Sequence, residues 1–173
     1  MIPEEFIKFW TIKNSNGIEK PNGPEKRMSV EYIRLKTELQ DLRTELLSYI
    51  KPQKAKSGGL IAIFDDEAIN LMTRYESVEA AYENLKSDIE TVTKIANGPS
   101  LDLLRNERHR LKTFLENADH AIESAKRAAI KSHKDDKVIE AQTKRDKLAE
   151  TYSGRLSEIE ALLKKANDII SKY

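Results

Sequence analysis

The sequence predicts an all-α protein, built as an elongated antiparallel helical bundle or as coiled-coil hairpins, with three to four long helices and an N-terminal arm. Two observations support this prediction. Apolar residues recur in alternating steps of four and three along most of the chain, which keeps one stripe of each helix facing a partner. Only 6 glycines and 5 prolines interrupt 173 residues, of which 34% are charged. Few helix breakers among many charged residues are typical of long helices.

The clearest repeat starts at Phe64 and predicts a helix over residues 64–97. Its apolar steps run without interruption, so one stripe faces a neighbouring helix along the whole length. Gly98 and Pro99 form a stop signal, and Ser100 suits the cap of a following helix. So short a connection brings the next helix back antiparallel beside this one. The stripe contains Phe64, Ala68, Leu71, Tyr75, Val78, Tyr82, Leu85, Ile89 and Val92.

Residues 1–23 are predicted to form an N-terminal arm with a short helix, attached to a helical body over residues 24–173. Phe9 and Trp10 follow Phe6 by three and four residues, so the three aromatic rings share one helix face. Two interpretations stay open. The arm folds back and buries its aromatic residues, or it anchors a partner or a second protomer through them. The second interpretation makes Phe6, Phe9 and Trp10 the predicted partner-binding residues.

A first long helix is predicted over residues 24–51, because Pro52 prevents its continuation. Its apolar residues again alternate in steps of four and three. We interpret Ile33, Leu47 and Ile50 as additions that widen this stripe, which suits a bundle of several helices better than a two-stranded coil. The stripe itself contains Met28, Tyr32, Leu35, Leu39, Leu42, Leu46 and Tyr49.

Two further helices are predicted over residues 100–132 and 136–173. The apolar stripes on the two sides of this junction do not share one phase. The prediction takes a tight turn here, with Asp135 or Asp136 as the new cap, while one continuous helix with a phase shift stays open. Gly154 lies inside the last segment and indicates a kink.

Charge is distributed unevenly along the chain, although the net charge is only +1. Residues 57–98 carry a net charge of −5, and the segments before and after them each carry +3. An acidic central helix between basic neighbours favours charge matching between packed helices of the same chain. A net charge so close to zero gives no global field that would attract nucleic acid.

Chemistry-bearing motifs are missing from the sequence. His109 and His120 are separated by about 16 Å along one helix, too far to share a metal, and His133 lies at the junction. The chain has no cysteine, no His-Glu-x-x-His pattern and no glycine-rich phosphate-binding or nucleophile motif. We therefore expect no enzyme activity, no cofactor and no metal site.

One basic surface is a candidate for binding a polyanion. In an up-down-up-down bundle, the connection at residues 51–59 and the junction at residues 131–137 share one end. Lysines and an arginine gather there in sequence, next to a flexible Ser-Gly-Gly segment, and such a group could contact a phosphate backbone. The predicted residues are Lys51, Lys54, Lys56, Lys126, Arg127, Lys131, Lys134 and Lys137.

Two functional hypotheses follow. The first is a non-catalytic assembly, scaffold or adaptor protein that binds a protein partner or itself through coiled-coil helix faces and the aromatic arm. The alternative is a nucleic-acid-binding accessory factor of the recombination or packaging type that uses the basic end. Because no apolar run approaches a membrane span and the N-terminus is acidic, we also expect no membrane insertion and a cytoplasmic location.

Overall fold

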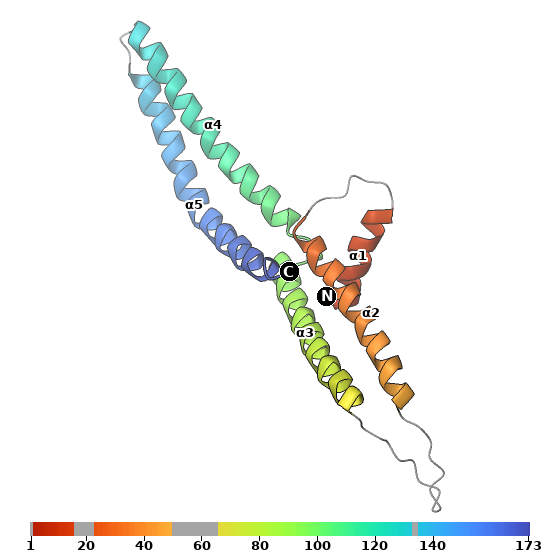
Figure 1. The fold of residues 1–173 in the computed structure, drawn as a ribbon. Coiled ribbons are helices and arrows are strands. Elements are labelled where there is room, and N and C mark those ends of the chain that lie inside the picture. Colours follow the sequence, from red (N-terminus) through yellow and green to blue (C-terminus); the bar gives the residue numbers. More distant parts are fainter. Residues whose placement is uncertain (1, 16–22, 50–65, 133–134) are drawn as a thin grey trace, which may run out of the picture. The chain divides into compact units, whose positions relative to one another are not determined.

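The protein is all-α, as the sequence predicts, and Figure 1 shows its helices in a computed structural model. The structure describes residues 2–15, 23–49, 66–132 and 135–173. Over these residues the chain forms helices and turns, without strands. None of the described helices combines the length and the apolar character needed to cross a membrane. The helices are α1 (Pro3–Ser15), α2 (Glu25–Tyr49), α3 (Asp66–Ala96), α4 (Asp102–Ser132) and α5 (Asp136–Ile170).

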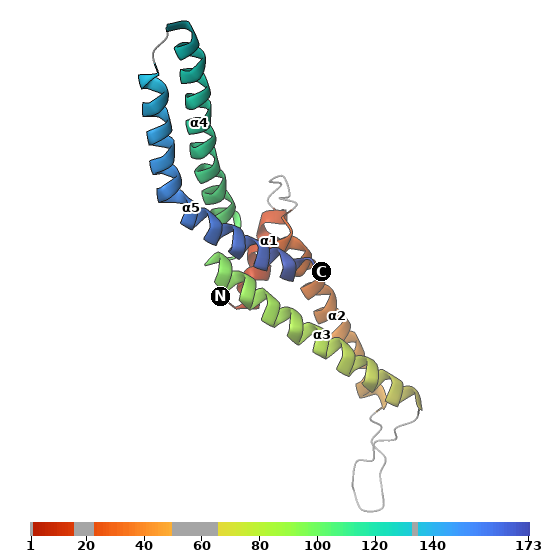
Figure 2. The same cartoon turned by 90° about the vertical axis from the view of Figure 1, so that its left-hand side faces the viewer.

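The helices divide between two compact units. Unit 1 contains Met1–Lys94 together with Ile169–Tyr173, and unit 2 contains Ile95–Asp168. Within unit 1, α2 packs on α3, and within unit 2, α4 packs on α5, as both views show (Figures 1 and 2). The described helices therefore pack in pairs, α2 with α3 in unit 1 and α4 with α5 in unit 2.

In unit 1 the predicted heptad stripes face each other. Met28 and Tyr32 on α2 and Leu85 and Ile89 on α3 are buried. Tyr82 on α3 bonds Tyr32 on α2. Arg74, eight residues before Tyr82 on α3, bonds Glu38, six residues after Tyr32 on α2. The two helices are therefore antiparallel.

One interpretation of the α2 pattern was wrong. Ile33 and Leu47 do not widen the core stripe, because 47% and 57% of their surfaces are exposed. An α-helix turns by about 100° per residue, which places the two side chains about 100–160° around α2 from Met28 and Leu35, away from the core-facing stripe. Ile50, the third residue of that interpretation, lies outside the described residues.

Helix α1 packs back on α2. Phe6 and Trp10 are buried, with ring centroids 6.4 Å apart. The Tyr32 hydroxyl donates a hydrogen bond to Glu4 Oε1 at 2.9 Å, and the Tyr82 hydroxyl donates to the Tyr32 oxygen at 2.8 Å. This chain of three polar groups connects α1, α2 and α3.

The connection between α3 and α4 uses the predicted stop signals. α3 ends at Ala96, and Asn97 adopts a left-handed conformation with φ of 50°. Asparagine tolerates this conformation better than most residues, so it can end a helix where glycine is more usual. Ser100 Oγ accepts a hydrogen bond from the Asp102 backbone N–H at 3.2 Å, as expected of a cap.

Unit 2 is an antiparallel pair, and α4 and α5 are separate helices, which resolves the question of one helix or two. The Asp135 carbonyl accepts hydrogen bonds from the N–H groups at the start of α5, so Asp135 occupies the cap position. Arg145 and Arg155 on α5 pair with Asp119 and Glu107 on α4, whose order is reversed. α5 runs through Gly154 as one α-helix.

Candidate functional site: a solvent-facing stripe on α2

A second row of residues follows heptad spacing on α2, on the side opposite the buried stripe. Its steps alternate three and four, and it lies about 150° around the helix from the core-facing residues. Ten of the 25 residues of α2 are charged, yet none of the six in this row is. The row consists of Val30, Ile33, Thr37, Gln40, Thr44 and Leu47, and we call it the α2 stripe.

The α2 stripe faces solvent along its whole length. Val30, Ile33 and Leu47 are 57%, 47% and 57% exposed, which is unusual for large aliphatic side chains that follow a regular repeat. The polar members of the stripe are exposed as well. Lys26, one heptad step before Val30, marks its N-terminal limit.

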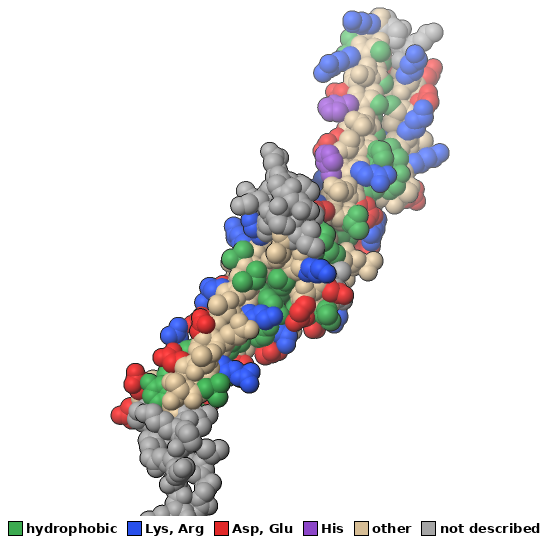
Figure 3. Space-filling view, turned by 90° about the vertical axis from the view of Figure 1, so that its right-hand side faces the viewer, with side chains coloured by type: hydrophobic (Ala, Val, Ile, Leu, Met, Phe, Trp, Pro, Cys, Tyr) green, Lys and Arg blue, Asp and Glu red, His purple; other side chains and the backbone are tan. Residues whose placement is uncertain are grey.

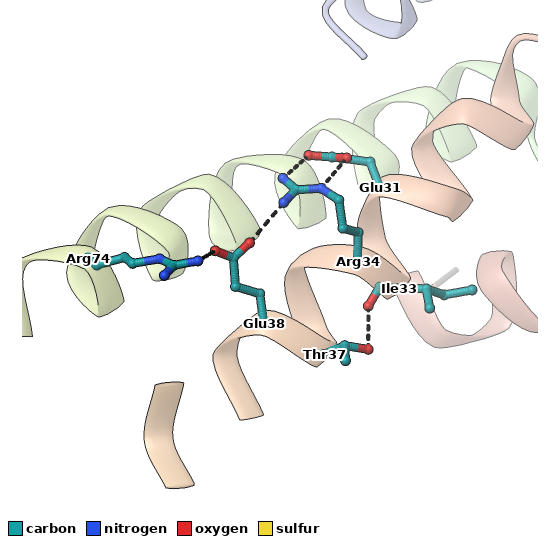
Figure 4. A network of polar contacts seen from close by, with 6 residues as sticks. All are labelled: Glu31, Ile33, Arg34, Thr37, Glu38 and Arg74. Carbon is teal, nitrogen blue, oxygen red and sulfur yellow. Dashed lines mark hydrogen bonds and ion pairs between the residues drawn. The ribbon is translucent and has the colours of Figure 1, made fainter. Parts of the chain in front are cut away.

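The two threonines are less polar than their type suggests. Thr37 Oγ1 donates a hydrogen bond to the Ile33 carbonyl at 3.0 Å (Figure 4), and Thr44 Oγ1 donates to the Gln40 carbonyl at 2.9 Å. Because each hydroxyl is satisfied by the backbone of its own helix, the methyl group is left to the surface. The middle of the stripe is therefore a row of methyl groups around one amide.

Charged residues border the stripe on both sides. On one side Arg34 bonds both Glu31 and Glu38, and Glu38 also accepts a hydrogen bond from Arg74 on α3 at 2.6 Å (Figure 4). The hydrogen bond from Arg74 holds the pKa of Glu38 below its ordinary value. These ion pairs hold Arg34 away from the stripe and tie α2 to α3.

The predicted partner-binding residues of the arm pack in unit 1. Phe6 and Trp10 are 0% and 1% exposed, and Phe9 is half-buried with its ring edge-on to Trp10. The arm thus folds back, as in the first of the two interpretations. Phe6 and Trp10 can reach a partner only if α1 detaches from α2.

The predicted polyanion-binding residues are only partly described. Lys126, Arg127 and Lys131 near the end of α4 and Lys137 at the start of α5 are exposed. Lys51, Lys54, Lys56 and Lys134 lie outside the described residues. That all eight share one end of the molecule stays a prediction. On the face drawn in Figure 3, basic and acidic side chains are interspersed.

The histidines of the described residues do not come together in a metal site. His109 and His120 are exposed on α4, and His133 lies outside the described residues. Within the part of the chain that the structure describes, no three histidine, cysteine or carboxylate side chains come close enough to hold a metal ion.

Apolar periodicity alone does not reveal the α2 stripe, because half of its members are threonine and glutamine. The signal that could have found it is the absence of charge. Six consecutive heptad positions without a charged residue are unexpected on the exposed side of a helix as charged as α2.

Comparisons with protein families, with curated proteins and with solved structures found no match for this chain.

Proposed function

We propose that the protein is a non-catalytic assembly protein, a scaffold or adaptor that binds other protein chains through its helix faces. The α2 stripe is the observation that supports this proposal most directly. A regular, uncharged, solvent-facing row on an otherwise highly charged helix is the pattern by which one helix recognises another.

Contact energies are consistent with such a role. Covering the exposed parts of Val30, Ile33 and Leu47 would contribute about 1 kcal/mol for each side chain. Packing around the threonine methyl groups adds to this, while the Gln40 amide requires a hydrogen-bonding partner of defined position. The stripe therefore suits a specific contact of moderate affinity.

The aromatic arm has a supporting role in this proposal. Since Phe6 and Trp10 fill the core of unit 1 beside α2, α1 helps to hold the helix that presents the stripe. A variant without α1 would lose this support and would not test partner binding cleanly.

Polyanion binding is the second candidate function. It is favoured by the exposed Lys126, Arg127, Lys131 and Lys137 near the α4–α5 turn. Asp135 and Asp136 at the same turn oppose it. Binding that depends on such phosphate contacts weakens steeply with salt, whereas binding through the α2 stripe does not.

A matched pair of substitutions tests the proposed function. Thr37→Glu places a charge in the α2 stripe, and Thr73→Glu places the same charge on α3, where Thr73 is also exposed and its hydroxyl bonds the Ile69 carbonyl in the same way. Immobilised wild-type protein and Thr73→Glu should retain the same partner chain, and Thr37→Glu should lose most of it. Retention that is equal for all three proteins, or absent from all three, contradicts the proposal.

Nucleic acid in the same eluates decides between the two candidates. If the wild type retains only nucleic acid, in a salt-dependent manner that Thr37→Glu leaves unchanged, polyanion binding replaces protein binding as the leading function.

A further inference from the structure

We infer that the α2 stripe docks a second copy of this chain, with the two α2 helices parallel and related by a two-fold axis. This inference rests on the proposed function, because it names the partner of the same surface. It is carried by the self-complementary order of residues in the stripe and by the charges at its borders.

A parallel pair places each stripe residue against its own copy. Thr37 then meets Thr37 of the second copy, and Thr44 meets its copy, in layers where small side chains with satisfied hydroxyls let two helices come close. Gln40 meets Gln40, and an amide can donate to and accept from an identical amide. Val30, Ile33 and Leu47 close the two ends of the contact with apolar layers.

The bordering charges favour the same arrangement. Lys36 comes directly before Thr37 and borders the stripe on one side. Asp41 comes directly after Gln40 and borders the stripe on the other side. In a parallel pair Lys36 of each copy can turn from the Tyr32 ring, whose centroid is 6.0 Å from its Nζ, to Asp41 of the other copy, which makes two symmetric ion pairs. The other charged border residues, Arg34 and Arg43, lie level with Ser29 and Ser48 of the other copy. Ser29 is buried within its own chain and Ser48 is uncharged, so no like charges meet.

An antiparallel pair loses this match. Lys36 of one copy would then lie beside Arg43 of the other, and the symmetry would repeat the repulsion. Arg34 could face Asp41, but Arg34 is already held by Glu31 and Glu38 on its own helix. The border charges therefore select the parallel orientation.

The extent of the contact sets its strength. The stripe spans 18 residues of helix, about 25 Å in length. A single helix face of this size covers an area near the lower limit of specific interfaces, and three of its six layers are polar. We expect a reversible dimer that forms at about 10–100 µM chain concentration.

Sedimentation velocity over a concentration series tests self-association. The wild-type mass should rise from the 19.8 kDa of one chain towards twice this value. Thr37→Glu brings two carboxylates into one layer and should weaken association by about tenfold or more. Thr73→Glu is the matched control and should behave as the wild type. A wild type that stays monomeric across the series, or a Thr37→Glu protein that associates as well as the wild type, overturns the inference.

Exchanging the border charges tests the pairing. Lys36→Glu and Asp41→Lys should each weaken the dimer, because each creates two like-charge contacts across the interface. The double variant restores opposite charges and should recover most of the wild-type association. If the double variant is no better than the two single variants, the parallel pairing is wrong.

Orientation can be measured directly because the chain has no cysteine. Leu47→Cys should form a disulfide-linked dimer on mild oxidation, since the two copies of residue 47 meet in a parallel pair. In an antiparallel pair the two copies of residue 47 lie about 25 Å apart. Leu47→Cys should then form no more disulfide-linked dimer than the control variant Thr73→Cys. Failure of self-association alone leaves the proposed function standing, provided that Thr37→Glu still abolishes capture of a different chain.

Discussion

At the scale of single residues, the Tyr32 side chain connects the arm to the rest of unit 1. It is 2% exposed, accepts a hydrogen bond from Tyr82 and donates one to Glu4. Burial first, and then these two hydrogen bonds, raise the pKa of Tyr32 far above its ordinary value. The hydrogen bond that the Glu4 carboxylate accepts from its own backbone N–H, followed by the one from Tyr32, lowers the pKa of Glu4.

Replacing Tyr32 by phenylalanine should lower the free energy of unfolding by about 1 kcal/mol. The substitution removes the hydrogen bond to Glu4 and leaves the Tyr82 hydroxyl without its acceptor. Urea unfolding followed by circular dichroism measures the effect. Tyr75→Phe is the control, because the Tyr75 hydroxyl is 3.4 Å from Glu79 in an exposed pair, and its removal should change stability by less than about 0.5 kcal/mol.

The raised pKa of Tyr32 also predicts a loss of stability in alkali. An unfolded tyrosine ionises near pH 10, while the folded protein holds the Tyr32 proton to higher pH. Its contribution is therefore complete below about pH 10 and decreases as the pH rises further. Unfolding free energies between about pH 9 and pH 11 should fall more steeply for the wild type than for Tyr32→Phe. Parallel curves for the two proteins would contradict this assignment.

At the scale of helices, the end of α3 was predictable because it depends on local chemistry. α3 was predicted over residues 64–97 and spans Asp66–Ala96, ended by the signals at Asn97 and Gly98. α2 covers Glu25–Tyr49 of the predicted helix 24–51, whose last two residues lie outside the described residues. A cap or a stop needs only the residues at that point, so the sequence contains the whole cause.

The side that a helix presents to solvent was less predictable. Ile33 and Leu47 were assigned to the core from their apolar type, and only their position around α2 shows them to be exposed. Most buried side chains are apolar, but an apolar side chain is not always buried, since a folded surface also contains aliphatic side chains. Thr37 and Gln40 gave no apolar signal at all, so the α2 stripe was missed.

Two glycines should respond in opposite directions to substitution by alanine. Gly154 lies inside α5, and an added Cβ there meets no atom within 4 Å, so Gly154→Ala should raise stability by about 0.5–1 kcal/mol. At Gly23 an added Cβ would lie 3.0 Å from the Trp10 ring and 3.1 Å from Glu25 Oε2. Gly23→Ala should therefore lower stability. Thermal unfolding of both variants checks the two signs, and a stabilised Gly23→Ala would contradict the close packing of α1.

At the scale of the whole molecule, unit 1 is completed by residues from the far end of the sequence. Asp88 on α3 accepts a hydrogen bond from the Tyr173 hydroxyl at 2.7 Å and pairs with Lys172 at 3.0 Å. Ile170 is 1% exposed. The heptad stripes and the charged segments of the sequence did not predict this contact. Every helix has a similar stripe, and no stripe identifies the helix that it packs against.

Truncating Ile170 should therefore destabilise the protein despite its place in the last turn of α5. Ile170→Ala removes a buried side chain and should cost about 2–4 kcal/mol. Ile139→Ala removes the same atoms from the first turns of α5, where Ile139 is 64% exposed, and should cost less than about 0.5 kcal/mol. Urea unfolding of the two variants compares them. Similar losses for both would show that the end of α5 is not part of the unit 1 core.

Trp10 has a consequence for how this molecule can be observed. It is the single tryptophan of the sequence, and it is buried in unit 1. Tryptophan emission therefore reports on unit 1 alone, whereas far-ultraviolet circular dichroism sums the helices of both units. Trp10 is thus an intrinsic optical probe of unit 1. A loss of circular dichroism during denaturation that tryptophan emission does not follow reports on unit 2.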